Sequence, residues 1–168
     1  MRIPKRHYNL QQQANLKKWF ATRPEKTKKH AAIAWACEQD DAVERLMDCL
    51  NRTEQVGDCL IWTGAVVHHY SAVGITITDI RPSPSVHVAG HRLVFALTNG
   101  IEALPEGTRA LKSDDLVIDH LCGNSKCVQP QHLRVITHSE NTSLQGVERI
   151  APPLSFGRVI AVSGEMVA

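Results

Sequence analysis

The sequence predicts an α+β protein in which helices come first and short strands follow. Apolar residues before position 56 recur near helical spacing. After Gly57, the stretches "DCLIWTG" and "SAVGITITD" are rich in β-branched and aromatic residues, which is typical of short strands. At 168 residues, the chain can bury a real core in one domain. We expect a helical segment over residues 1–56, a mixed domain over 57–146 and a tail over 147–168.

The helical segment divides near Pro24. Residues 9–20 have helical composition, and "TRPEKTKK" places a proline where a second helix would begin. Apolar residues then recur near helical spacing at Ile33, Cys37, Val43, Leu46, Met47 and Leu50. Trp35 lies off that stripe, so one long helix and two shorter helices both fit. We interpret Cys37 and Cys49 as packing residues, because they stand where small core residues would.

Charge is distributed unevenly along this segment. Residues 1–30 carry nine Lys or Arg against one acid, whereas residues 31–60 carry two against seven. A basic arm on a near-neutral body indicates an anionic partner, usually nucleic acid, although a solvated charged helix fits the charge equally well. The candidate contacts to a DNA backbone are Lys17, Lys18, Lys28 and Lys29.

The cysteine content indicates a metal site in a reducing compartment. No apolar run reaches the roughly 18 residues of a membrane span, and the basic N-terminus lacks the apolar stretch of a secretory signal. Five cysteines are an odd number, which argues against a complete disulfide framework. We therefore expect a cytoplasmic protein without a membrane partner, in which the close pair Cys122 and Cys127 binds metal.

Strands and helices follow one another in the second half of the chain. The stretch "VHVAGHRLVFALTNG" predicts a strand and then a helix that ends near Asn99. "LVIDH" predicts a strand that ends on Asp119 and His120, and "LRVIT" predicts a second strand. A helix follows, opened by a capping box between Thr137 and Glu140. The predicted order over residues 116–146 is strand, cysteine loop, strand and helix.

Three metal-ligating side chains are concentrated in the cysteine loop. Cys122, Cys127 and His132 lie within eleven residues. Structural zinc sites take four such Cys and His ligands, and the nearest sensible fourth is Cys59, which opens the first strand. The alternative is unligated cysteines, which we disfavour because free cysteines are uncommon in polar loops.

Asp119 and His120 form a second candidate site with Asn141. If the strand pair folds back and the capped helix packs across it, Asn141 faces both residues. Carboxylate and amide oxygens suit Mg²⁺, which keeps several waters and takes one or two protein ligands. A neutral imidazole beside that ion can accept a proton from water.

The stretch "DHLCGNSKCVQPQHLRVITHSEN" resembles the ββα-metal (His-Me finger) core of the HNH nucleases. It is most similar to the zinc-stabilised, His-Cys-box kind found in homing and phage endonucleases. The resemblance extends through "HRLVFALTNGIEALPEG" and "DCLIWTG", and so covers residues 57–146. It implies a ββα-metal core with a structural zinc, preceded by an antiparallel sheet and an N-terminal helical segment.

The resemblance implies a metal-dependent DNA endonuclease that hydrolyses phosphodiester bonds. His120 would be the general base, and Asp119 and Asn141 would hold Mg²⁺, for which Mn²⁺ is an expected substitute. The implied ligands of the structural Zn²⁺ are Cys59, Cys122, Cys127 and His132. The chain departs from the family in having Gln129 before Pro130, where Asn-Pro is common, and in having no cysteine for a second zinc site after Cys127.

Several contacts and partners remain open at this point. Arg92 and Arg81 are candidates for contacting the scissile phosphate, and His91 either contacts phosphate or packs its helix, with packing favoured. Candidate base contacts on the strands are His68, His69, Tyr70 and Thr76. Double-stranded DNA is the implied partner, a homodimer would suit cleavage of both strands, and the implied setting is a bacterial or phage-infected cell. The tail either adds an edge strand, embraces a partner subunit or frays.

Two other functions compete with the nuclease. The first is a zinc-stapled DNA-binding protein with little or no nuclease activity, which has no need of the Asp119, His120 and Asn141 trio. The second is a zinc-stabilised interaction domain with no role on nucleic acid, which the basic arm disfavours.

Overall fold

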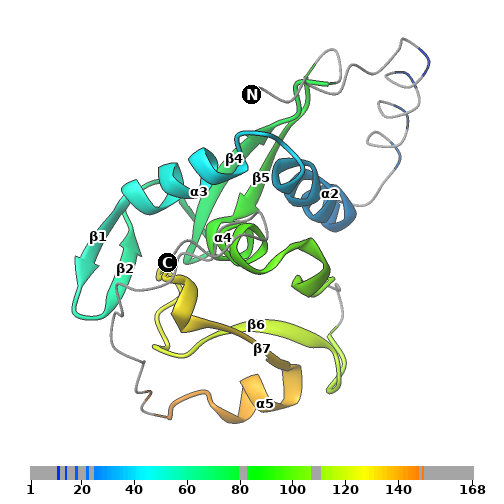
Figure 1. Cartoon of the computed structure of the whole chain (residues 1–168). Helices are drawn as coiled ribbons and strands as arrows, with labels where there is room; N and C mark the ends of the chain where they lie inside the picture. The colour runs from blue at the N-terminus through cyan, green and yellow to red at the C-terminus, as the bar shows by residue number, and fades with distance from the viewer. Residues whose placement is uncertain are drawn as a thin grey trace, which may run out of the picture.

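A computed structural model describes residues 25–79, 83–106, 111–147 and 149, together with the isolated helical residues 11, 14, 18 and 22. Lys17, Arg81 and nearly all of the predicted tail lie outside these residues. Figure 1 shows the helix α4 (Gly90–Asn99) in the middle of the fold, between the strands β4 (Tyr70–Thr76) and β5 (Ser85–Ala89) on one side and β6 (Leu116–His120) and β7 (Leu133–Thr137) on the other. Among the described residues, every helix is too short or too polar to cross a membrane.

The helical segment forms two helices, α2 (Glu25–Cys37) and α3 (Ala42–Asn51). The polar residues 38–41 separate them, which decides between the one-helix and two-helix predictions. Both helices pack on α4, and their buried faces supply Ala32, Ile33, Ala36, Ala42, Leu46 and Cys49 to the core. Cys49 is buried and Cys37 is half-buried against the same cluster, so their interpretation as packing residues is confirmed.

All strand pairs are antiparallel, which gives the predicted α+β class. The strands are β1 (Thr53–Val56), β2 (Cys59–Trp62), β3 (Val66–Val67), β4 (Tyr70–Thr76), β5 (Ser85–Ala89), β6 (Leu116–His120) and β7 (Leu133–Thr137). They pair as β1–β2, β3–β4–β5 and β6–β7. The prediction of a wholly helical segment up to residue 56 is therefore wrong at its end, because Thr53–Val56 pairs with β2.

Small residues place the central helix. Gly90 begins α4, and a Cβ there would lie 2.6 Å from Oγ of Ser71 on β4, so only glycine allows the first turn to approach the sheet so closely. Gly100 ends the helix at φ 87°, a conformation that glycine adopts readily. A short 3-10 helix, η1 (Ile101–Ala103), follows within the predicted loop.

The last unit is the predicted strand, loop, strand and helix. In the β6–β7 pair, Asp119 lies opposite Arg134 and His120 opposite Leu133. Helix α5 (His138–Ser143) follows directly, drawn in orange in Figure 1. The predicted capping box is present, since the backbone N–H of Glu140 donates to Oγ1 of Thr137 and that of Thr137 donates to Oε2 of Glu140. Strands β6 and β7 and helix α5 form the ββα core.

Candidate functional site

The four predicted metal ligands come together. Cys59 begins β2, Cys122 and Cys127 lie in the cysteine loop (residues 121–129), and His132 ends the 3-10 helix η2 (Pro130–His132). One ligand atom from each lies within 4.8 Å of the others. The structure thus places Cys59, the weakest assignment from spacing alone, beside the three side chains of the loop.

Backbone pairing carries Cys59 to the loop. The edge of β2 that β1 leaves free bonds to the cysteine loop: the N–H of Trp62 donates to the carbonyl of Lys126 at 3.0 Å, and the N–H of Val128 donates to that of Leu60 at 2.9 Å. An isolated bridge between Ile61 and Cys127 lies between these two bonds. The loop thus serves as a third strand of the hairpin, although the two segments are far apart in sequence.

The spacing of the ligand atoms fits zinc. Nδ1 of His132 lies 3.7 Å from Sγ of Cys59 and 3.6 Å from Sγ of Cys127. A tetrahedral zinc with ordinary bond lengths would hold a sulfur and a nitrogen about 3.6 Å apart. A hydrogen bond from Cys127 lowers the pKa of the Cys122 thiol, whereas burial raises that of Cys59. A cation would favour the thiolate form of all three.

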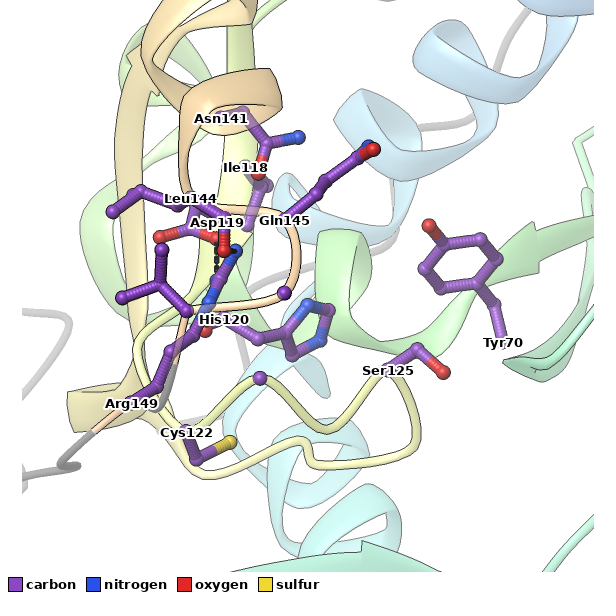
Figure 2. Close-up of a pocket in the computed structure, with 13 residues that line it drawn as sticks. Tyr70, Ile118, Asp119, His120, Cys122, Ser125, Asn141, Leu144, Gln145 and Arg149 are labelled. Carbon is purple, nitrogen blue, oxygen red and sulfur yellow. Dashed lines mark hydrogen bonds and ion pairs between the residues drawn. The ribbon is translucent and has the colours of Figure 1, made fainter.

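A pocket opens beside this cluster and is lined by Asp119, His120 and Asn141 (Figure 2). Asp119 and His120 end β6, and Asn141 is the fourth residue of the six-residue helix α5. The hairpin therefore brings the three predicted site residues to one cavity, although 21 positions separate His120 from Asn141. Tyr70 and Arg149 also line it.

His120 has the environment of a neutral imidazole. The residue is buried, and its Nε2 has no hydrogen-bond partner among the residues that the structure describes. Burial lowers the pKa of His120, which outweighs the opposite effects of Cys122, Asp119 and a backbone hydrogen bond with Cys127. The ring is thus held in its neutral form in the wall of the pocket.

Two aromatic rings lie close to the ring of His120. His91, at the start of α4, lies edge-on to His120 with ring centroids 4.8 Å apart, and Tyr70 lies 5.2 Å from His91 and 6.4 Å from His120. Burial and the two neighbouring groups His120 and Arg92 hold the pKa of His91 well below its usual range. The ring of His91 is buried and packs against the rings of both Tyr70 and His120.

The surroundings of Asp119 differ from those expected for a metal ligand, because two arginines bind its carboxylate. Nε of Arg134 lies 3.0 Å from Oδ2, and Nη1 of Arg149 donates to Oδ1. The sequence reasoning identified neither arginine. The signal for Arg134 was its place opposite Asp119 in the predicted strand pair, whereas no local pattern marked Arg149.

Of the candidate phosphate and DNA contacts that the structure describes, Arg92, Lys18, Lys28 and Lys29 are not among the residues that line the pocket. The guanidinium of Arg92 is partly buried and donates to the carbonyl of Pro105, and burial lowers its pKa. Lys18 and Lys29 are exposed and Lys28 is half-buried. Tyr70, a candidate base contact, instead lines the pocket.

Comparison with known proteins agrees with this geometry. Residues 88–143 match the family model described as HNH endonuclease. The match runs from β5 to the last residue of α5, and so includes the pocket trio and three of the four metal ligands, while Cys59 lies outside it. No curated protein and no solved structure matches the chain significantly.

Proposed function

We propose that the protein is a metal-dependent endonuclease that hydrolyses phosphodiester bonds in double-stranded DNA, as the match of residues 88–143 to the HNH endonuclease family model suggests. The observation that carries the proposal is the convergence of His120, Asp119 and Asn141 on one pocket. A domain that only bound DNA would have no need of this trio.

Asp119 and Asn141 are the proposed ligands of a catalytic divalent ion. Their oxygens are the kind that Mg²⁺ prefers, and Mn²⁺ is the expected substitute. The guanidinium of Arg149 binds the carboxylate of Asp119. This contact supports a cation site at Asp119, because a positively charged group already lies where the ion would bind. When bound, the ion would stabilise the negative charge that develops on the scissile phosphate and the leaving 3′ oxygen.

His120 is the proposed general base. Its neutral ring accepts a proton from a water molecule, which attacks the phosphorus while the bond to the 3′ oxygen breaks and that oxygen takes up a proton from a second water molecule. The products carry 5′-phosphate and 3′-hydroxyl ends. The edge-on ring of His91 limits rotation of His120. A positioned base of this kind contributes about 10²–10⁴-fold to the rate.

The quartet of Cys59, Cys122, Cys127 and His132 is the proposed structural zinc site. Its role is to hold the cysteine loop, which begins directly after the general base and has little apolar content of its own. All four ligand positions are protein side chains, which leaves no open position for a substrate and fits a structural ion.

DNA binding outside the pocket is assigned to the basic residues of the N-terminal segment. Lys28 and Lys29 lie on the first turns of α2, and contacts from such lysines to phosphates would make binding strongly salt-dependent. Arg92, partly buried on Pro105, is a weaker candidate for the phosphate. Cutting both strands with one site per chain would call for a homodimer or two binding events. The proposed setting is the cytoplasm of a bacterial or phage-infected cell.

Plasmid cleavage by zinc-loaded protein tests the proposal. Supercoiled plasmid should be cut when Mg²⁺ is added and left intact without it. Asn141→Ala should cut much more slowly while keeping its zinc, whereas Asn99→Ala, an exposed change at the end of α4, should cut normally. Zinc-loaded protein that binds plasmid but never cuts it would favour the DNA-binding alternative.

A further inference from the structure

The carboxylate of Asp119 is shared between an inner and an outer arginine. The side chain of Asp119 is 1% exposed, that of Arg149 is 16% exposed and that of Arg134 is 42% exposed. Arg134 approaches from the neighbouring strand β7, at the surface. Arg149 approaches from beyond α5, and Figure 2 shows its side chain within the pocket beside Asp119.

Further contacts fix the side chain of Arg149. Its Nη1 also donates to the backbone carbonyl of His120 at 2.7 Å, and its Nη2 donates to that of Leu144, the C-cap of α5, at 3.3 Å. The aliphatic stem crosses Gly123, where an added Cβ would lie 3.2 Å from Cδ of Arg149. The guanidinium therefore connects the end of β6 to the end of α5, at the carboxylate proposed to bind metal.

We infer that Arg149 is a built-in cation that occupies the metal-binding carboxylate of the DNA-free protein, so that a divalent ion binds Asp119 only by displacing it. This inference rests on the proposed function. One carboxylate with two guanidinium groups already carries a net positive charge, and a divalent ion placed beside them would be repelled. Removal of Arg149 relieves most of that repulsion and frees Oδ1.

A purely structural role for Arg149 makes a different prediction. If the side chain only clamped the end of α5 to β6, its replacement would lower thermal stability and leave metal affinity unchanged or weaker. If the side chain competes with the metal, its replacement tightens metal binding. Stability and metal affinity therefore move in opposite directions only when Arg149 is a competitor.

The test is Mn²⁺ binding by the zinc-loaded, full-length protein without DNA, followed through the EPR signal of free Mn²⁺. Arg149→Gln removes the charge and is expected to bind Mn²⁺ about tenfold more tightly than wild type, within the range usual for coupled sites. Arg149→Lys keeps the positive charge but lacks the several N–H donors of a guanidinium, and its Mn²⁺ affinity is expected to lie between those of wild type and Arg149→Gln. Lys126→Gln, which removes one charge from an exposed position in the cysteine loop, should bind Mn²⁺ as wild type does.

Asp119→Asn separates this inference from the proposed function. If Asp119→Asn abolishes Mn²⁺ binding but Arg149→Gln and Arg149→Lys bind no more tightly than wild type, the inference is wrong and the proposed metal site stands. If the double variant Asp119→Asn, Arg149→Gln keeps the tighter binding, the metal lies elsewhere and both are wrong. The inference is supported if the gain appears in Arg149→Gln and disappears in the double variant.

Discussion

The ring of His91 lies edge-on against the ring of His120, with the two centroids 4.8 Å apart. His91 is held in turn from β4, because its backbone N–H donates to Oγ of Ser71 at 3.3 Å. The central helix α4 thus sets the orientation of the proposed general base, although it contributes no ligand and no proposed catalytic residue.

His91→Ala should therefore reduce cleavage through the loss of positioning. Without the ring, His120 has space to rotate, and we expect kcat to fall by up to about 10²-fold with KM and zinc content nearly unchanged. His91→Phe keeps a ring against His120 and should retain most of the activity. Steady-state cleavage kinetics measure both. If the phenylalanine variant is as impaired as the alanine variant, the imidazole of His91 acts chemically and the positioning role is wrong.

Loss of one metal ligand should cost both zinc and stability. Cys122→Ser leaves three of the four ligands, and because structural zinc contributes its binding free energy to folding, of the order of 10 kcal/mol, the variant should melt at a much lower temperature. Zinc content by atomic absorption and a thermal melt measure the two effects. The control is Cys37→Ser, a half-buried cysteine that is not part of the quartet and should keep its zinc. Equal zinc loss in both variants would contradict the assignment.

The two core thiols should make the protein less stable in alkaline solution. Burial raises the pKa of both Cys37 and Cys49 from the usual 9.0 to about 11. The folded state therefore holds these protons more tightly than the unfolded state, so the stabilisation is complete below pH 9 and is lost as the pH rises through 11. Urea unfolding between pH 8 and about 11 should show a shallower decline for Cys49→Ala than for wild type. Parallel declines would contradict this account.

The capping box should stabilise the helix that carries Asn141. Thr137→Ala removes the hydroxyl that accepts from the Glu140 N–H, and we expect a loss of about 1 kcal/mol in the free energy of unfolding. Cleavage should also slow, because fraying of the first turn of α5 displaces Asn141. Thr142→Ala is the control, since its exposed hydroxyl donates to the carbonyl of His138 within the same helix. Urea unfolding of both variants is the measurement, and equal losses would rule out a special role for the cap.

Local patterns predicted the ββα core and most of the site. Strand composition located Asp119 and His120 at the end of β6, and the capping box located the start of α5, because both signals lie within a few adjacent residues. The cluster of Cys59, Cys122, Cys127 and His132 was predicted because its side chains have a distinctive chemistry, even though Cys59 joins the other three through pairing between distant segments.

The features that the sequence did not predict depend on tertiary contacts or on weak local signals. Arg149 reaches Asp119 only through the fold of the chain beyond α5, and His91 meets His120 only because α4 packs beside the hairpin. Strand β1 was missed because "TEQV" follows a helix directly. Its side chains are mostly exposed, so the sequence lacks the alternation of apolar and polar residues that indicates a strand.

Cleavage of supercoiled plasmid by His120→Ala tests the central claim most directly. The measurement compares wild type, His120→Ala and the matched control His87→Ala, an exposed histidine on β5, all loaded with zinc and supplied with Mg²⁺. We expect His120→Ala to cut about 10²–10⁴-fold more slowly with its zinc intact, and His87→Ala to cut as wild type does. Cleavage by His120→Ala at the wild-type rate would show that His120 is not the general base and would contradict the account.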